Sequence, residues 1–394
     1  MATNSPPQSS SIPFYRDQRV LRIIAQVVSA IVVFGLVYLG IVNMLSAADA
    51  LSINLTFDFL NQPAGFPISD TIIEYDPSLP YRYAILVGLL NTLRISLAGI
   101  VLATILGTFV ALARLSSNWL LSKLALGYIE FHRNIPLLVL LFLWYTSVFQ
   151  KLPSVADAFE LPGPTFISQR GVFMTWPRVT ETGKPLVYGL LLGILLAYLA
   201  FRFLRNKRAE TGKNTYYQLI SLAILIGGAL IGWFASGGSP LMLDIPERGT
   251  FNFQGGNRMT PEYAALFIAL IMYTAGFIAE VVRAGIQSVS KGQMEAASAV
   301  GLKQNQTLSL VILPQALRVI IPPMISQYLN LTKNSSLALA IGYQDVFSVG
   351  KIAINQSGRS IPVFVIIMGI YLSLSLITSA IMNVYNRRIQ FVSR

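Results

Sequence analysis

Long apolar stretches recur along the 394-residue chain and are separated by shorter polar segments. About 20 consecutive apolar residues are enough for a helix to cross the hydrocarbon core of a bilayer. The pattern predicts eight such helices, over residues 23–45, 84–113, 135–149, 186–204, 217–234, 263–282, 320–341 and 361–385. The third stretch is short, and we expect its flanks to extend it. The predicted fold class is an all-α polytopic membrane protein.

The loops between these helices differ in charge. Residues 46–82 contain five acidic residues and one basic residue, whereas residues 202–213 contain five basic residues and one acidic residue. Lys and Arg are enriched in cytoplasmic loops. With eight spans, the N-terminal tail, residues 114–133, 202–213 and 283–318 and the C-terminal tail all fall on one side. We therefore expect both termini in the cytoplasm.

This arrangement divides the chain into segments. A cytoplasmic tail (1–22) precedes an extra N-terminal transmembrane helix (23–45) and a periplasmic loop (46–83), and residues 84–386 form the main membrane domain. A second cytoplasmic tail covers residues 387–394.

The fourth and fifth helices have the character of an insertion, within residues 151–262. The outer segments around them contain Pro, Gly and aromatic residues, and can pack as small caps. Each of the two helices carries a pair of glycines four residues apart, at Gly189 and Gly193 and at Gly228 and Gly232. This spacing allows helices to approach closely, although glycine is also simply common in membrane helices.

Composition narrows the function classes. Hydrophobic residues make up 54% of the chain and charged residues only 12%, about half the charged share of a soluble domain. The net charge of +12 lies in short patches between apolar stretches, so a lipid bilayer explains it and nucleic-acid binding is not expected. There is no Cys and a single histidine, His132, which we place in a loop beside Arg133. Neither a metal site nor catalytic residues are expected.

The polar segment over residues 284–319 predicts a helix-turn-helix on the cytoplasmic side. Ser290 can cap a helix over residues 291–300, with Gln293 completing a capping box. Gly301 suits the left-handed position that ends a helix, and a second helix follows.

The first of these short helices carries small and apolar residues on one predicted face, formed by Met294, Ala297 and Val300. A helix with such a face is suited to lie in a groove of a partner protein.

The same segment resembles the EAA loop of ABC importer permeases. The resemblance covers Gly292, Glu295, Ala296, Ala297, Gly301, Leu302, Leu313 and Pro314. It implies coupling to a separate ATPase homodimer that binds ATP and Mg²⁺, with no cofactor on this chain. Consistent with this, no G-x-x-x-x-G-K-[ST] phosphate-binding loop occurs in the sequence.

Further motifs, at residues 91–93, 131–138, 279–285 and 332–338, are similar to those of the polar amino-acid permeases. The extra N-terminal helix and the inserted pair most resemble a general L-amino-acid permease subunit. This resemblance implies the type I ABC importer fold, a second homologous permease chain and a periplasmic amino-acid-binding protein. It also implies an amino-acid substrate and location in the bacterial inner membrane. His132 departs from the family, which more often has an aromatic residue before Arg.

Charged residues lie within or beside the predicted spans at Arg94, Glu280, Arg283 and Lys333. Each costs about 2.5–3.5 kcal/mol at a helix centre and should therefore face water or a partner. Glu280 can pair with Arg283, three residues later, or it can face the translocation path and meet a substrate ammonium group. Arg94 can extend to the membrane surface or pair with an acid of a partner subunit.

A polar patch interrupts the seventh span. It consists of Asn330, Lys333, Asn334, Ser335 and Ser336. One interpretation is a hydrogen-bond network between helices; the other is that the patch lines the translocation path and binds the carboxylate of a zwitterion.

The function predicted from these features is that of a non-enzymatic permease subunit of an ATP-driven importer for polar or general L-amino acids. The alternative is a secondary transporter or channel for small polar solutes. Such proteins commonly show mirrored halves or a repeated filter motif, and neither is found. An intramembrane enzyme is disfavoured by the lack of Cys, the single His and the few intramembrane carboxylates.

Overall fold

The computed structural model describes residues 18–50 and 55–389, so residues 1–17 and 390–394 of the two predicted tails lie outside the described residues. The helices are α1 (Gln18–Ala50), α2 (Tyr81–Arg114), α3 (Trp119–Asn134), α4 (Leu137–Phe142), α5 (Lys184–Thr211), α6 (Tyr217–Ala235), α7 (Pro261–Gln287), α8 (Lys291–Ala299), α9 (Gln304–Thr307), α10 (Leu313–Asn334), α11 (Val346–Ser357) and α12 (Ser360–Ile389). Among the described residues, seven helices are long and apolar enough to cross a membrane, or eight if one bent pair counts as a span. This agrees with the predicted number.

The bent pair is the third predicted span. It joins α3 to residues 137–151 at an angle of 105°. The bend falls at Pro136, and Ile135 before it is extended (φ −101°, ψ 131°), as is usual for a residue preceding proline. Residues 119–134, which we expected in a cytoplasmic loop, are therefore mostly helix.

His132 lies on this helix, so the prediction of a loop position was wrong. The side chain is buried, and its Nδ1 donates to the carbonyl oxygen of Tyr128 at 2.9 Å. Its ring contacts that of Tyr128, with 4.2 Å between centroids. His132 is thus a packing residue between helices.

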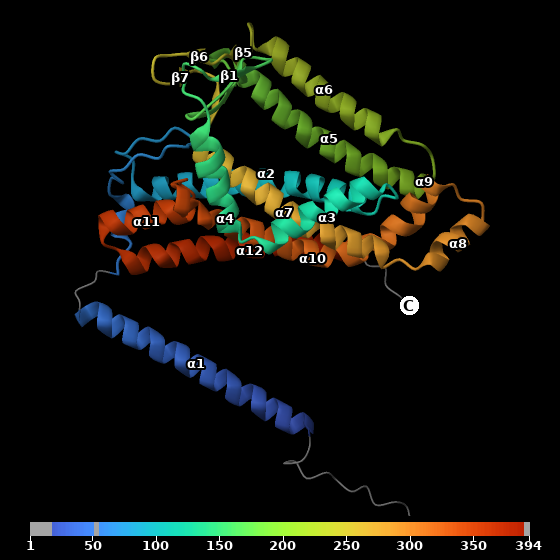
Figure 1. Ribbon diagram of the computed structural model, residues 1–394, viewed down its shortest axis with the longest axis horizontal. Helices are drawn as coiled ribbons and strands as arrows, with labels where there is room; N and C mark the ends of the chain where they lie inside the picture. The colour runs from blue at the N-terminus through green and yellow to red at the C-terminus, as the bar shows by residue number, and fades with distance from the viewer. Residues whose placement is uncertain (1–17, 51–54, 390–394) are drawn as a thin grey trace, which may run out of the picture.

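The centre of the bundle is formed by α2, α7 and α10 (Figure 1). These helices approach closely where glycine leaves room. A Cβ atom on Gly107 of α2 would lie 2.8 Å from the carbonyl oxygen of Ala275 in α7. One on Gly285 of α7 would lie 2.2 Å from Cγ1 of Ile320 in α10.

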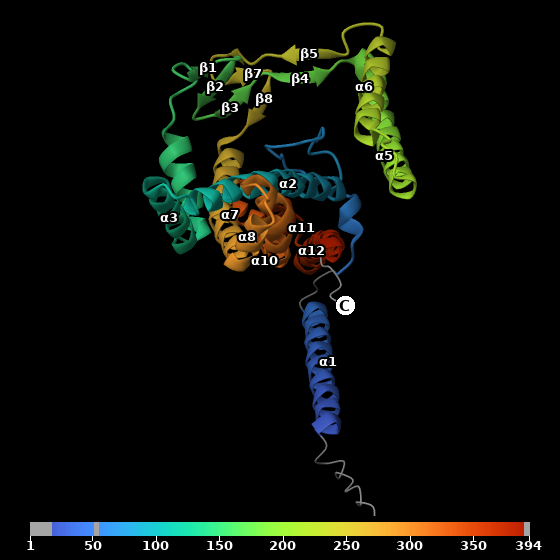
Figure 2. The same cartoon turned by 90° about the vertical axis from the view of Figure 1, so that its right-hand side faces the viewer.

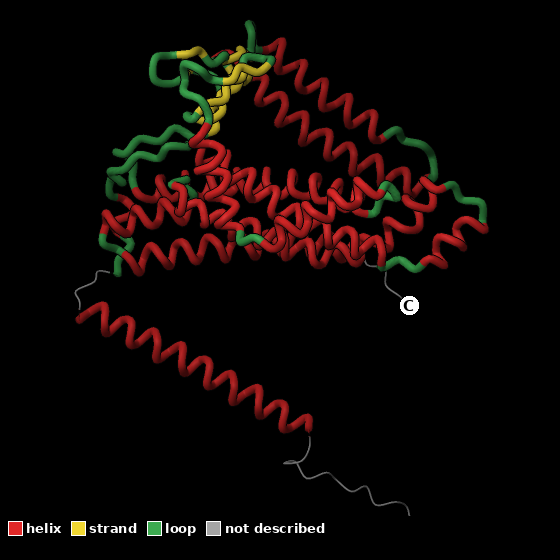
Figure 3. The backbone as a smooth tube through the Cα atoms, in the orientation of Figure 1, coloured by secondary structure: helices red, strands yellow, loops and turns green. Residues whose placement is uncertain are grey.

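The two outer segments of the insertion form β-structure as well as loops (Figure 3). The strands are β1 (Phe159–Leu161), β2 (Thr165–Ser168), β3 (Gly171–Met174), β4 (Trp176–Val179), β5 (Leu241–Asp244), β6 (Glu247–Arg248), β7 (Phe253–Gln254) and β8 (Asn257–Met259). An antiparallel sheet has the order β1-β2-β3-β8 and joins both segments. The segments thus pack as a cap, and the strands add to a fold that is otherwise helical.

The inserted helices α5 and α6 form a hairpin that packs chiefly on itself. The ribbon of β4 and β5 carries this hairpin away from the central bundle, and α1 also stands apart from it (Figure 2). A Cβ atom on Gly228 would lie 2.7 Å from the carbonyl oxygen of Gly189. The glycine pairs therefore mark a real close approach between the two helices.

Candidate functional site

The loop between α7 and α10 contains α8, as the sequence predicted. Ser290 occupies the N-cap position, but its side chain makes no capping hydrogen bond, so the proposed capping box with Gln293 is not formed. One helix later, the side-chain oxygen of Gln306 accepts from the backbone N–H of Lys303 at 2.9 Å, at the start of α9. Gln293 is used differently, because its side chain accepts a hydrogen bond from Gln315 of α10 at 3.1 Å. That bond links α8 to the following span.

Gly301 ends α8 in the left-handed conformation (φ +81°). Its N–H donates to the carbonyl oxygen of Ser298 at 3.0 Å, and the N–H of Leu302 donates to that of Ala297 at 3.1 Å. These two bonds form a Schellman motif, which satisfies the last carbonyl groups of a helix. The turn that directs the chain from α8 to α9 is therefore fixed by hydrogen bonds.

The exposed surface of α8 differs from the predicted apolar face. Ala297 is only 5% exposed and packs inward, whereas Val300 is 76% exposed. Glu295 and Ala296 are exposed. The surface available to a partner therefore carries Glu295 between small and apolar side chains, and Ala297 supports it from beneath.

A cavity of about 390 Å³ opens between α8 and the start of α10. It is lined by Met294, Ser298, Leu302, Gln304, Thr307, Leu308 and Ile312. Leu313 and Pro314 follow directly and begin α10. The residues predicted for the coupling loop thus lie in one compact element that connects α7 with α10.

The polar patch at residues 330–336 does not share one environment, because four of its residues line two separate cavities and Ser335 lines neither. Asn330 and Asn334 line a cavity of about 250 Å³ together with Gln327 of α10 and with Tyr273, Thr274 and Phe277 of α7. All six side chains are uncharged, and three of them carry carboxamide groups. Amide groups can both donate and accept hydrogen bonds, so this cavity can bind a solute with two opposite charges.

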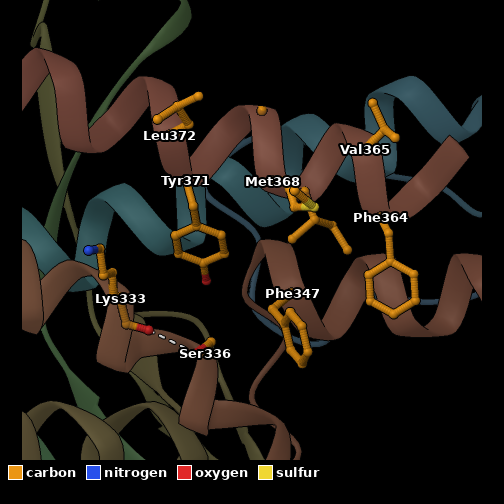
Figure 4. Close-up of a pocket in the computed structure, with 10 residues that line it drawn as sticks. Lys333, Ser336, Phe347, Phe364, Val365, Met368, Tyr371 and Leu372 are labelled. Carbon is orange, nitrogen blue, oxygen red and sulfur yellow. Dashed lines mark hydrogen bonds between the residues drawn. The ribbon is translucent and has the colours of Figure 1, made fainter. Parts of the chain in front are cut away.

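Lys333 and Ser336 lie on the other side of α10, beside α12 (Figure 4). The cavity there measures about 700 Å³ and is otherwise mainly apolar, with Phe347, Phe364, Met368 and Leu372 in its lining. The Ser336 hydroxyl donates to the Lys333 carbonyl oxygen at 2.8 Å. Lys333 is exposed, although it belongs to a helix that crosses the membrane.

Ser335 has a different environment from its neighbours. It is fully buried, and its hydroxyl donates to Oδ2 of Asp345 at 3.2 Å. Asp345 also accepts from the Tyr371 hydroxyl of α12 at 2.9 Å and caps α11 through the N–H of Ser348. Ser335 therefore belongs to a hydrogen-bond network between helices and does not line a cavity.

Glu280 is paired with Arg283 on its own helix, with 2.9 Å between the arginine Nε and Oε2. The side chains are 31% and 26% exposed, respectively. Glu280 lines neither of the two cavities beside α10. Arg94 lies over the ring of Tyr263, 4.3 Å from its centroid. The two alternatives predicted for Arg94 stay predictions.

The motif at residues 91–93 holds the outer ends of the helices together. The Asn91 side-chain amide donates to the carbonyl oxygens of Asp70 and Gln344, at 2.7 and 2.9 Å. The Thr92 hydroxyl accepts from the N–H of Val346 at 3.1 Å. This motif anchors the outer loop and α11 to α2.

Sequence reasoning missed four residues of the smaller cavity, namely Tyr273, Thr274, Phe277 and Gln327. Gln327 could have been found, because it precedes Asn330 by three residues and Asn334 by seven and so shares their helix face. The α7 residues gave no such signal, since a Tyr or Thr in an apolar span is common. Elsewhere in the described chain, no three His, Asp or Glu side chains lie close enough together to hold a metal ion.

Comparison with known proteins agrees with this architecture. Residues 99–391 match the family of binding-protein-dependent transport system inner membrane components. The chain is 40% identical to the general L-amino acid transport system permease protein AapQ of Rhizobium johnstonii, over 96% of this chain and 94% of that protein. It is 42% identical to the putative amino-acid ABC transporter permease protein YhdX of Escherichia coli, over 94% of each.

A third relative, the glutamate/glutamine/aspartate/asparagine transport system permease protein BztB of Rhodobacter capsulatus, is 39% identical over 92% of this chain and 93% of that protein. Among solved structures, an amino acid ABC transporter with histidines aligns with a TM-score of 0.46 and 21% identity, over 78% of this chain and 95% of that chain. The family match and the near full-length relatives lead to one conclusion: the chain belongs to the binding-protein-dependent transport system inner membrane components.

Proposed function

We propose that this protein is the permease subunit of an ATP-driven importer that moves amino acids into the cell. The observation that carries the proposal is the uncharged polar cavity between α7 and α10, the two helices that α8 joins. The relatives AapQ, YhdX and BztB are named as amino-acid transport permeases, which supports the substrate class.

The cavity offers complementary groups to the two ends of an amino acid. The N–H groups of Asn330, Asn334 and Gln327 can donate to a carboxylate. The rings of Tyr273 and Phe277, with centroids 4.9 Å apart, can attract an ammonium group. Because no charged side chain lines the cavity, the recognition of the substrate does not depend on one fixed ion pair.

The movement would reach this cavity through α8. Its exposed Glu295 and Ala296 would contact a separate ATPase homodimer, which supplies the ATP and Mg²⁺ sites, so this chain itself is not an enzyme. Since Gly285 and Ile320 hold α7 tightly against α10, a push on α8 would move both helices together. Such a rigid-body movement can exchange outward for inward access.

A second homologous permease would cover the face that carries Lys333. An exposed ammonium group inside the membrane needs water or a partner, and no acidic residue lines the large cavity beside it. A neighbouring subunit, or the water-filled path between two subunits, would meet that need. A periplasmic amino-acid-binding protein would deliver the substrate at the outer face. The protein would lie in the inner membrane, with both termini in the cytoplasm.

The experiment is amino-acid uptake into vesicles that contain the complex purified from native membranes. The proposal expects a second permease and an ATPase to copurify, with uptake that depends on ATP and on a binding protein. Replacing Asn330 with Leu should reduce uptake at least tenfold, since about 1.4 kcal/mol of lost substrate binding corresponds to a factor of ten. Asn383→Leu, at an exposed position of α12 outside the cavity, is the control. Uptake by this chain alone, driven by an ion gradient, would overturn the proposal in favour of a secondary transporter.

A further inference from the structure

The turn between α5 and α6 encloses a small polar cavity that transport does not explain. Its volume is about 190 Å³. It is lined by Arg208, Asn214, Tyr216, Tyr217, Gln218 and Leu219. In Figure 1 this turn lies toward the same end of the molecule as α8 and α9, which is the end with the basic loops.

The turn is held in a defined shape. Gly212 ends α5 in the left-handed conformation, and its N–H donates to the carbonyl oxygen of Arg208 at 3.0 Å. The Thr215 hydroxyl donates back to the carbonyl oxygen of Leu204 at 2.9 Å. The N–H of Tyr216 donates to Oδ1 of Asn214 at 3.3 Å. The cavity is therefore formed by hydrogen-bonded backbone and not by a loose loop.

The groups around this cavity favour a negatively charged ligand. The guanidinium group of Arg208 lies over the ring of Tyr217, 5.7 Å from its centroid, and forms no ion pair with the described residues. Four more bases lie in the same stretch, at Arg202, Arg205, Lys207 and Lys213, against one acid, Glu210. A guanidinium group beside amide donors is a common arrangement for binding phosphate oxygens.

The surroundings of the cavity favour a phosphate that belongs to a lipid headgroup. The hairpin packs on itself, and the apolar side chains next to the turn are exposed: Phe203 is 67% exposed and Leu219 is 65% exposed. In a membrane these side chains contact lipid tails, so the basic turn lies at the level of the lipid headgroups. Basic pockets at that level are typical sites for anionic headgroups.

We propose that the α5–α6 turn binds the headgroup phosphate of an anionic phospholipid through Arg208 and Asn214. The site needs only the membrane location of the hairpin and is independent of the transported substrate. It would also fix the tip of a hairpin that has few contacts with its own bundle.

The test compares two variants that lose the same charge. The full transporter complex is purified, reconstituted in phosphatidylcholine nanodiscs with a small share of phosphatidylglycerol, and analysed by native mass spectrometry for retained lipid. Arg208→Gln should reduce phosphatidylglycerol retention about tenfold, as expected for the loss of one charge-assisted contact. Lys207→Gln, at a residue outside the cavity lining, should retain it like the unchanged protein. Arg208→Lys should retain an intermediate amount, because it keeps the charge but not the planar fork.

Three outcomes would overturn this assignment. Equal losses in Arg208→Gln and Lys207→Gln would mean diffuse attraction of the basic loop to the membrane. Unchanged retention in every variant would mean that the cavity holds no lipid. Displacement of the lipid by an equal concentration of inorganic phosphate would identify a site for soluble anions. Elution of the Arg208→Gln complex at the normal position in gel filtration excludes misfolding as the cause of any loss.

Discussion

The pair α7–α10 and the hairpin α5–α6 have the same kind of close helix contact, but only the first pair lies inside the bundle. In both, glycine allows two helices to approach so closely that an added Cβ atom would overlap a neighbour. However, 56% of the residues in an apolar 18-residue stretch of α7 are buried, whereas only 6% are buried in the corresponding stretch of α6. The first pair is embedded in the bundle and is joined by the short helix α8, whereas the hairpin is attached to the remainder through the β4–β5 ribbon. We therefore expect the close contact to transmit movement in the first pair, where both helices are held by neighbours, and not in the hairpin.

Matched glycine substitutions provide the strongest test of this comparison. Gly285→Val and Gly228→Val each place a side chain within 3 Å of the facing helix. Overpacking of this kind costs about 1–3 kcal/mol or more. Gly285→Val should abolish uptake, because it separates α7 from α10 between the cavity and α8. Gly228→Val should open the hairpin and leave most uptake, measured in vesicles at equal protein content. Equal losses in both would mean that the hairpin is as essential as the central pair.

The turn after α8 is expected to give the next largest effect. Gly301→Val forces a β-branched residue into a left-handed conformation, at a cost of roughly 1–2 kcal/mol, and should disturb the Schellman turn. Uptake and binding-protein-stimulated ATP hydrolysis should fall severalfold while membrane insertion stays normal. Gly127 of α3 has nothing within 4 Å of an added Cβ atom and an ordinary φ, so Gly127→Val is the control. Normal uptake by a correctly inserted Gly301→Val protein would argue against coupling through α8.

A substitution in the ion pair on α7 tests whether Glu280 only pairs with Arg283 or also faces the translocation path. Glu280→Gln removes one partner of a partly exposed pair, worth about 1 kcal/mol or less, so thermal stability should fall slightly. Uptake of acidic, basic and neutral amino acids should decrease to a similar extent. A selective loss of basic amino acids would instead place Glu280 in the path. Gln287→Glu, about two turns further along the same helix, tests whether added charge alone changes selectivity.

The smallest effect is expected at the outer end of α7. Asp70 is buried, and its Oδ2 accepts from the Thr260 hydroxyl at 2.5 Å. Burial raises the pKa of Asp70 despite the opposing effects of that hydrogen bond, Arg94 and Arg258. The folded protein thus binds the proton more tightly than the unfolded chain, so stability should rise as the pH falls from above the folded pKa toward the unfolded value near 3.8. Thermal unfolding measured from pH 7 down to pH 4 should show this rise, and Asp70→Asn should lose it. An identical pH dependence in the variant would mean that Asp70 does not contribute.

Local sequence signals were sufficient for the elements that depend on a few adjacent residues. The apolar stretches predicted the spans, since an unpaired backbone in lipid must form helices. Gly301 predicted the end of α8, because few other residues accept its positive φ. The capping of α8 was not predicted correctly, as Ser290 and Gln293 could form a capping box but Gln293 instead bonds to Gln315, a residue on another helix.

The polar residues at the end of α10 show where local signals end. As a sequence, Asn330, Lys333, Asn334 and Ser335 formed a single polar patch, and both a hydrogen-bond network and a lined path fitted it. Only the positions of α7, α11 and α12 show which interpretation applies to which residue, because these helices determine which side of α10 is covered. Ser335 is paired with Asp345, whereas Asn330 and Asn334 face a cavity shared with α7.

The sequence by itself therefore determined the membrane class, the number of spans and the short helix with its turn between α7 and α10, since hydrophobic length and residue-specific backbone preferences act over short distances. Tertiary structure alone decided which polar side chains share a cavity, where the third span bends in space, and how far the inserted hairpin stands from the bundle. These features depend on contacts between residues up to hundreds of positions apart, as between Asn91 and Gln344, and no local pattern encodes such contacts.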